Sequence, residues 1–239
     1  MVLALAALLI GLSKTGFPGT GVLAVVMVAA VIPARESTGL ILPMLIVGDI
    51  FAVFYYHRHA AWKYLVRLIP FAVVGIVAGY FLLGVVNDVQ LRPIIGGIIL
   101  VMLTLNHWRN RMMGEDVKIP SGIWFPLVMG LMAGVTTMLA NAAGPIMIIY
   151  LLAMRLPRDA FLGTGAWYFL LLNCFKVPFS ADLGLVNELS LTVNLTLLPV
   201  IVIGALLGIR LVKRVPEKSF AILVQVLAAL TAVYLLIPK

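Results

Sequence analysis

A hydrophobic stretch near the start of the chain is interrupted where a membrane helix would be continuous. Residues 2–32 are apolar except for the segment from Gly11 to Gly21, GLSKTGFPGTG, which holds a lysine, a serine, two threonines, a proline and four glycines. Breaking a helix in lipid exposes backbone N–H and C=O groups, and each costs several kcal/mol unless protein or water satisfies it. Such a break is typical of a place where a membrane protein binds something.

The composition predicts an integral membrane protein of the helical kind. The chain has 239 residues, is 63% hydrophobic and only 11% charged, whereas a soluble domain is roughly 25% charged. Its apolar runs are about 20 residues long, while barrel strands are about 10 and alternate. The net charge of +8 comes from basic residues between apolar runs, which is typical of membrane loops and argues against a nucleic-acid partner.

The rest of the chain contains further apolar runs on either side of a polar link at residues 109–121. A second interrupted run covers residues 122–154 and is broken between Gly134 and Gly144. We therefore predict a first repeat at residues 1–108 and a second repeat at residues 122–239. The uninterrupted spans are expected at residues 36–56, 64–86, 89–108, 159–181, 191–212 and 218–237.

The two parts resemble a repeat, because their glycines and prolines coincide at two fixed offsets. Gly11 and Gly21 correspond to Gly134 and Gly144 at an offset of 123. A second block corresponds at an offset of 129, and an insertion near residues 181–190 explains the difference: Pro70, Gly75 and Gly79 with Pro199, Gly204 and Gly208. Two broken segments in corresponding positions indicate a transporter binding site.

The loop charges favour hairpins that enter the membrane and return to the same side. If every apolar run crossed, Lys and Arg would be divided eight to eight; if the two broken runs return, the division is twelve to four, with Lys14 left out of both counts. The second division agrees with the positive-inside rule. Each repeat then has one re-entrant hairpin and three crossings, so the second repeat is inverted and both termini are external. Long, kinked helices that do cross are the alternative.

In each hairpin the returning helix would begin at the tip, so its positive dipole end and free N–H groups would face the membrane centre. This suits a small anion with several oxygens. We predict Asp49 as a coupling residue, because a carboxylate inside a span is by default functional. The predicted substrate-binding residues are Lys14, Thr15, Gly16, Gly19, Thr20, Gly21, Thr136, Thr137, Asn141, Gly144, Asn173 and Lys176.

Other interpretations of these residues stay open. Lys14 can be a packing residue paired with Asp49, the glycines can serve helix packing only, and Lys176 can snorkel to an interface. Cys174 is interpreted as a small apolar filler. We expect no metal, cofactor or catalytic site, because no predicted membrane segment holds a histidine in its interior or paired carboxylates. The histidines flank apolar segments and are interpreted as interfacial loop residues: His57, His59 and His107.

Three stretches resemble the TauE/SafE sulfite-exporter family of bacterial membrane proteins. They are GLSKTGFPGTG at residues 11–21, LPMLIVGDI at residues 42–50 and YHRHAAW at residues 56–62. The resemblance covers nearly the whole chain and implies transport of sulfite, sulfoacetate or related small sulfur-containing anions across the bacterial inner membrane. It carries over the glycines of the first tip, Lys14 and the buried Asp49. Many relatives have a glycine-richer first tip without lysine, so Lys14 departs from the pattern.

We therefore predict a multi-pass transporter of the bacterial inner membrane for a sulfite or organosulfonate anion, working by alternating access around a midplane site. A passive anion channel of the same architecture is the alternative. The predicted partners are the small anion, the lipid bilayer and protons as a candidate coupling ion. The exact substrate, the direction of transport and the oligomeric state stay open.

Overall fold

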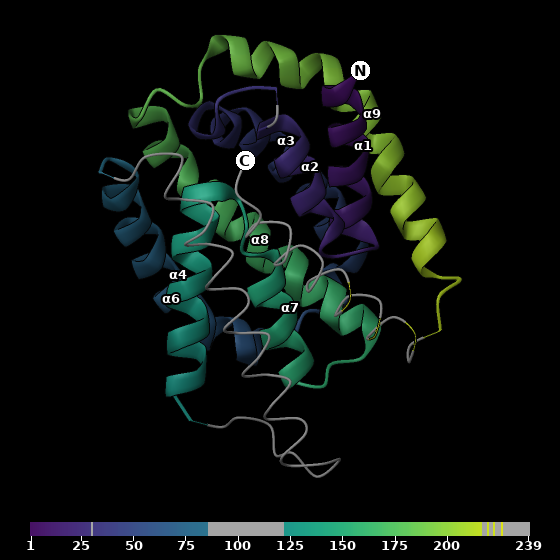
Figure 1. Cartoon of the computed structure of the whole chain (residues 1–239). Helices are drawn as coiled ribbons and strands as arrows, with labels where there is room; N and C mark the ends of the chain where they lie inside the picture. Colours follow the sequence, from purple (N-terminus) through teal and green to yellow (C-terminus); the bar gives the residue numbers. More distant parts are fainter. Residues whose placement is uncertain (30, 86–121, 217–218, 220–221, 223–225, 227–239) are drawn as a thin grey trace.

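The computed structural model describes residues 1–29, 31–85 and 122–216, and singly residues 219, 222 and 226. These residues form α-helices and one short 3-10 helix, η1 (Figure 1). In chain order the elements are α1 (Val2–Thr15), α2 (Thr20–Ala29), α3 (Ala34–Tyr56), η1 (His57–His59), α4 (Trp62–Leu83), α6 (Trp124–Ala140), α7 (Gly144–Ala153), α8 (Arg158–Asp182) and α9 (Glu188–Val212).

Four helices are long and apolar enough to cross a membrane, namely α3, α4, α8 and α9, each with 22 residues or more. A crossing needs about 20 residues. The spans predicted at 36–56, 64–86, 159–181 and 191–212 agree with these helices to within three residues at either end. The predicted span at 89–108 and the polar link at 109–121 lie outside the described residues, as does 218–237 apart from three single positions.

Each interrupted run is divided into two shorter helices. α1 and α2 have 14 and 10 residues, and α6 and α7 have 17 and 10, so all four are shorter than a crossing requires. The first break contains Pro18 and Gly19. The φ of Gly19 is 107°, a backbone conformation that residues with a side chain rarely adopt. The second break begins at Asn141 in the left-handed region, with φ of 52°, a conformation that asparagine tolerates better than most residues.

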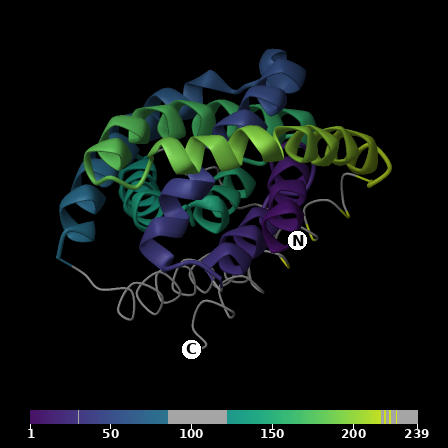
Figure 2. The ribbon, with the colours of Figure 1, turned by 90° about the horizontal axis from the view of Figure 1, so that it is seen from above.

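α2 returns alongside α1, and both Figure 1 and Figure 2 show the two helices side by side. Ser13 Oγ accepts a hydrogen bond of 2.9 Å from the Gly21 N–H across the break. α1 continues to Thr15, four residues past Gly11, where the interruption of the apolar run begins in the sequence. The Thr15 hydroxyl lies 3.1 Å from the Gly11 carbonyl oxygen one turn earlier and 2.7 Å from the Ala205 carbonyl oxygen of α9, so these two acceptors share its single proton.

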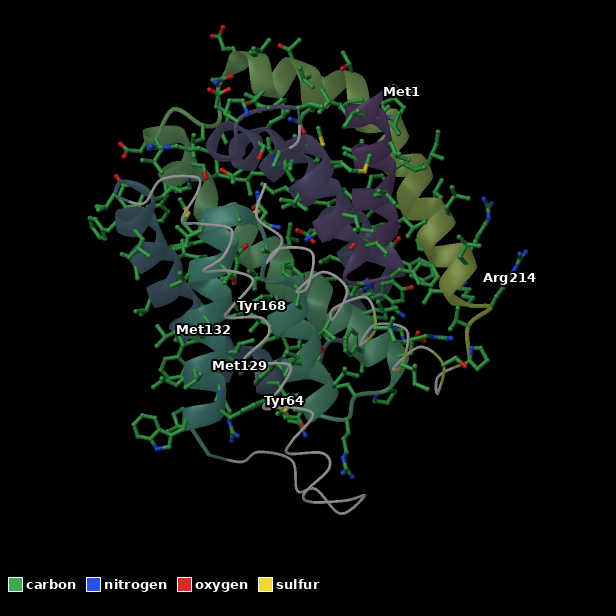
Figure 3. All side chains as sticks on the ribbon, viewed as in Figure 1. Met1, Tyr64, Met129, Met132, Tyr168 and Arg214 are labelled. Atoms are coloured by element: carbon green, nitrogen blue, oxygen red, sulfur yellow. The ribbon has the colours of Figure 1, made fainter. Side chains whose placement is uncertain are left out.

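The two interrupted runs start from opposite ends of the molecule. In Figure 1, α1 begins at the upper end, where the connection between α8 and α9 also lies. α6 begins at the lower end, and the connection between α7 and α8 lies there too. Figure 3 shows Met1 at the upper end and Tyr64, on α4, toward the lower end.

Glycines bring each interrupted run against a long helix of the other half of the chain. A Cβ on Gly11 of α1 would overlap the Ile201 carbonyl of α9, and a Cβ on Gly134 of α6 would overlap the Ala72 carbonyl of α4. These contacts correspond at the offsets of 123 and 129 found in the sequence. The reverse contacts correspond in the same way: Gly204 with the Leu8 carbonyl, and Gly75 with the Leu131 carbonyl.

The buried apolar side chains form two clusters. One is built by α1, α2, the first part of α3, and α9. The other is built mainly by α4, α6, α7 and α8. Each cluster therefore draws helices from both halves of the chain.

Candidate functional site

A cavity of about 70 Å³ lies where the two breaks meet α3 and α8. A water molecule occupies about 10–15 Å³ of a cavity measured in this way, so the cavity has room for several water-sized groups. It suits a small molecule. Its polar lining comes from both interrupted runs, from α3 and from α8: Ser13, Lys14, Asp49, Thr137, Asn141 and Asn173.

An ion pair joins the first interrupted run to α3 at the cavity wall. Lys14 Nζ lies 2.8 Å from Asp49 Oδ1, and the side chains are 11% and 0% exposed. Lys14 Nζ also lies 4.2 Å from the centre of the Phe169 ring on α8, a distance at which the ring face attracts a cation. Of the alternatives left open for Lys14, the pairing with Asp49 is therefore present, and the same lysine also lines the cavity.

Asn173 of α8 completes this cluster. Its Nδ2 donates a 2.6 Å hydrogen bond to Asp49 Oδ2, so the carboxylate is held from both the first and the second half of the chain. Asn173 Oδ1 is buried and has no hydrogen-bond partner within the described part of the chain. A buried acceptor without a partner is costly, and here it leaves a place for a water or for a donor group of a ligand.

Lys176 of α8 lies outside the cavity lining and holds the second break in place through hydrogen bonds. Its side chain is buried, with 2% exposure, and Nζ donates to Thr137 O at 2.9 Å, Thr137 Oγ1 at 3.1 Å and Asn141 Oδ1 at 2.6 Å. Three acceptors match the three N–H donors of an ammonium group. Lys176 therefore does not snorkel to an interface. Asn141 in turn donates to the Thr38 carbonyl of α3 at 3.0 Å.

These side chains leave a positive excess near the centre of the molecule. Lys14 is paired with Asp49, while the three hydrogen bonds of Lys176 go to neutral oxygens. Counted as formal charges, the two lysines and one aspartate sum to +1. Charge that deep is expensive unless a partner or ligand compensates it, so the cluster favours a negatively charged ligand.

Eight of the predicted residues lie together on the cavity wall, coming from α3, α8 and the two interrupted runs. Gly19, Gly21 and Gly144 present backbone there. The full set is Lys14, Gly19, Gly21, Asp49, Thr137, Asn141, Gly144 and Asn173.

The other predicted residues lie off the wall and make structural contacts. Thr15 Oγ1 donates to the Ala205 carbonyl of α9 at 2.7 Å, and Gly16 packs against the backbone of Gly208. Thr20 Oγ1 bonds to a carbonyl within its own break. Thr136 Oγ1 bonds one turn back along α6. With Lys176, these residues shape the breaks that present the wall.

At the first tip, the backbone N–H groups of Thr20 and Gly21 are hydrogen-bonded, whereas the sequence led us to expect free N–H groups there. Thr20 N–H donates to the Phe17 carbonyl at 3.2 Å, and Gly21 N–H donates to Ser13 Oγ. The short break turns back on itself, so these donors are used within it. Positive charge at this tip therefore comes mainly from the Lys14 side chain.

Sequence reasoning missed the apolar side of the cavity. Met147, Ile148 and Leu151 of α7 and Leu162 and Phe169 of α8 line it. Apolar residues inside apolar runs carry little signal of their own. A helical period of four residues back from Asn173, through Phe169, Gly165 and Phe161, could have indicated one face of α8.

Metal-binding clusters are absent from the part of the chain that the structure describes. His57 Nδ1 pairs with the Phe54 carbonyl at 3.0 Å in an exposed turn, and His107 lies outside the described residues. Cys174 is exposed on α8, so its interpretation as a small apolar filler is wrong. It falls on the outward face of a helix whose other face is buried.

Four long apolar helices and a cavity between two interrupted runs are typical of a multi-pass, membrane-embedded protein that moves small solutes. The chain belongs to the sulfite exporter TauE/SafE family, whose model matches residues 3–235. Searches of the curated proteins and of the solved structures gave no match. The family is one of exporters of sulfite and related sulfur-containing anions, so at the level of the family the protein is a membrane transporter.

Proposed function

We propose that the protein transports a small sulfur-containing oxyanion, sulfite or an organosulfonate, by alternating access around the cavity between the two breaks. The observation that carries this proposal is a cavity lined from both interrupted runs beside two lysines and one aspartate. An oxyanion there would compensate the excess positive charge and accept hydrogen bonds from Ser13, Thr137 and Asn141. The passive-channel alternative is not favoured, because the family is one of exporters.

The proposed architecture is an inverted repeat with one re-entrant hairpin and three crossings in each half. The equivalent glycine contacts at offsets of 123 and 129 support it, as do the opposite starting ends of α1 and α6 (Figure 1). The basic residues around η1, the α7–α8 connection and the end of α9 would then share the cytoplasmic side of a bacterial inner membrane, by the positive-inside rule. Both termini would be external.

The predicted organisation into a repeat at 1–108, a link at 109–121 and a repeat at 122–239 stays a prediction. Gly16, Pro18 and Gly19 would allow the first tip to change shape as the site alternates between the two sides. Lys14, Thr137, Asn141 and the backbone at Gly21 and Gly144 would contact the anion, while Thr15, Thr20, Thr136 and Lys176 would hold the tips in place.

A thermal-shift screen of the purified protein tests the binding site. Sulfite, sulfate, thiosulfate, taurine, isethionate and sulfoacetate are compared at constant ionic strength, because a ligand specific for the folded state stabilises it by mass action. We expect at least one anion to raise the melting temperature of the parent and to lose that effect in Lys14→Ala. An equal shift in Lys14→Ala would remove the assigned site.

Asp49 is proposed as the coupling residue, since its carboxylate faces Lys14, Asn173 and the cavity at once. Protonation would release Lys14 from its ion pair and increase the charge offered to the anion. We expect Asp49→Asn to abolish the dependence of transport on a pH gradient in reconstituted vesicles, while substrate binding persists. Unchanged dependence on the gradient would assign the coupling to another group.

A further inference from the structure

The cavity wall has a polar end and an apolar side. The polar end is formed by the cluster around Lys14 and Asp49, and the apolar side by Met147, Ile148 and Leu162. Oxygen atoms of a ligand that faced this apolar side would lose hydrogen bonds to water without replacement. An alkyl group in the same place would gain free energy from burial. A bare inorganic oxyanion therefore uses only part of the wall.

The charge of the cluster also selects among anions. With Lys14 and Lys176 positive and Asp49 negative, one negative charge on a ligand brings the sum to zero. A second negative charge would be left uncompensated among groups that are almost fully buried. An unpaired charge in such a place is costly, so a dianion is disfavoured as long as Asp49 is ionised.

The size of the cavity limits the ligand in the same way. Its volume of about 70 Å³ corresponds to roughly five to seven water-sized groups at about 10–15 Å³ each. A sulfonate head group has four heavy atoms, which leaves room for about one to three carbon atoms. A longer or branched tail would meet the Leu151 side chain and the facing wall of α8.

Taken together, the wall, the charge and the volume point to one class of substrate: we infer that the transported anion is a monovalent sulfonate with a short, unbranched apolar tail. This inference rests on the proposed function and narrows it. The sulfonate lies between Lys14, Thr137 and Asn141, and the tail lies against α7 and α8.

The test measures dissociation constants of the purified full-length protein in nanodiscs at constant ionic strength. Methanesulfonate, ethanesulfonate and 1-propanesulfonate vary the tail at one charge; sulfate and ethane-1,2-disulfonate carry two charges. We expect affinity to rise about fourfold for each methylene added, as full burial of a CH₂ group implies. Both dianions should bind at least about tenfold more weakly than ethanesulfonate, because one charge stays unpaired.

Two variants separate the tail from the charge. Gly165→Val adds bulk to the apolar side, where a Cβ would lie 3.7 Å from Leu151 Cδ1 in ordinary contact; it should weaken 1-propanesulfonate and spare methanesulfonate. Asp49→Asn raises the cluster charge by one and should improve sulfate relative to ethanesulfonate. Leu195→Ala, at a side chain that is 70% exposed on α9, is the matched control and should change neither ratio.

The outcomes distinguish this inference from the proposed function. If sulfate, methanesulfonate and 1-propanesulfonate bind alike and binding still requires Lys14, the transporter site stands and the substrate class is wrong. If none of these anions binds the parent protein, the proposed function itself fails. If Asp49→Asn does not fold, the series of tails on the parent and on Gly165→Val still decides the question.

Discussion

At the scale of single residues, the site depends on three charges brought together from distant parts of the sequence. Asp49 on α3 contacts Lys14 from the last turn of α1 and Asn173 from α8. Lys176, on the same helix as Asn173, secures the second break through Thr137 and Asn141. The network therefore links both interrupted runs through α3 and α8. Removing one of the three charges should change the hydrogen bonds and ion pairs that hold both runs.

The Lys14–Asp49 pair should show strong coupling in a double-mutant cycle. Lys14→Met or Asp49→Leu alone leaves an unpaired charge in a buried place, so each should destabilise the protein by about 3–5 kcal/mol. The double variant removes both charges and should be more stable than either single variant. Melting temperatures in detergent provide the measurement. A double variant as unstable as the sum of the singles would show that the two side chains act independently.

The sequence allowed these polar residues to be singled out, but it did not indicate which of them contact one another. Asp49, Lys176 and Asn173 stand out because polar groups inside apolar spans are rare. Which of them pair could not be read from the sequence, since Asp49 and Asn173 are joined only by the packing of α3 on α8. Apart from the four-residue period that links Gly165 to Asn173 on α8, the apolar side of the cavity carried little signal, because apolar residues that line a cavity resemble those that face lipid.

At the scale of helices, close packing of each interrupted run on a partner from the other half is the main constraint. Gly11 and Gly134 lie against backbone carbonyls of α9 and α4, where no side chain fits. Small residues let helices approach in this way, and in lipid such packing replaces the hydrophobic effect as a source of association. The interruption could be predicted from glycine and proline, but the partner helix could not.

Substituting these glycines should separate the helix pairs. Gly11→Ala and Gly134→Ala each place a methyl group on a backbone carbonyl, and overpacking of this kind costs about 1–3 kcal/mol or more. Gly165→Ala on α8 is the matched helical control, because its new Cβ has room. We expect lower melting temperatures for the first two variants and no loss for the third. Equal melting temperatures for all three would mean that the helices can move apart without cost.

At the scale of the whole molecule, the arrangement in Figure 1 places the ends of the elements on two opposite sides. The start of α3 and the start of α9 lie on one side, and η1 and the end of α9 on the other. The loop charges in the sequence predict that these two sides of the molecule face opposite sides of the membrane, because lysine and arginine counts differ between the two sides of a membrane. That orientation stays a prediction. The same counts contain no information on which helices touch.

Cysteine accessibility in a Cys174→Ala background tests the division. Single cysteines are introduced at four exposed positions: Glu36, His59, Glu188 and Arg214. With returning hairpins, Glu36→Cys and Glu188→Cys should react with an impermeant reagent from outside the cell, and His59→Cys and Arg214→Cys only after permeabilisation. If all apolar runs crossed, Glu36→Cys would instead share its side with Arg214→Cys, and His59→Cys with Glu188→Cys.

The exchange of packing partners has a consequence for ancestry. α1 closes on α9 and α6 closes on α4, so a polypeptide that carried only one of the two units would have no helix of its own to cover its glycine face. It would have to associate with a second copy inserted in the opposite orientation. On the proposed inverted-repeat architecture, the present gene would be a fused form of such an antiparallel dimer. We expect that severing the chain at the middle gives fragments that fold only when both are made in the same cell.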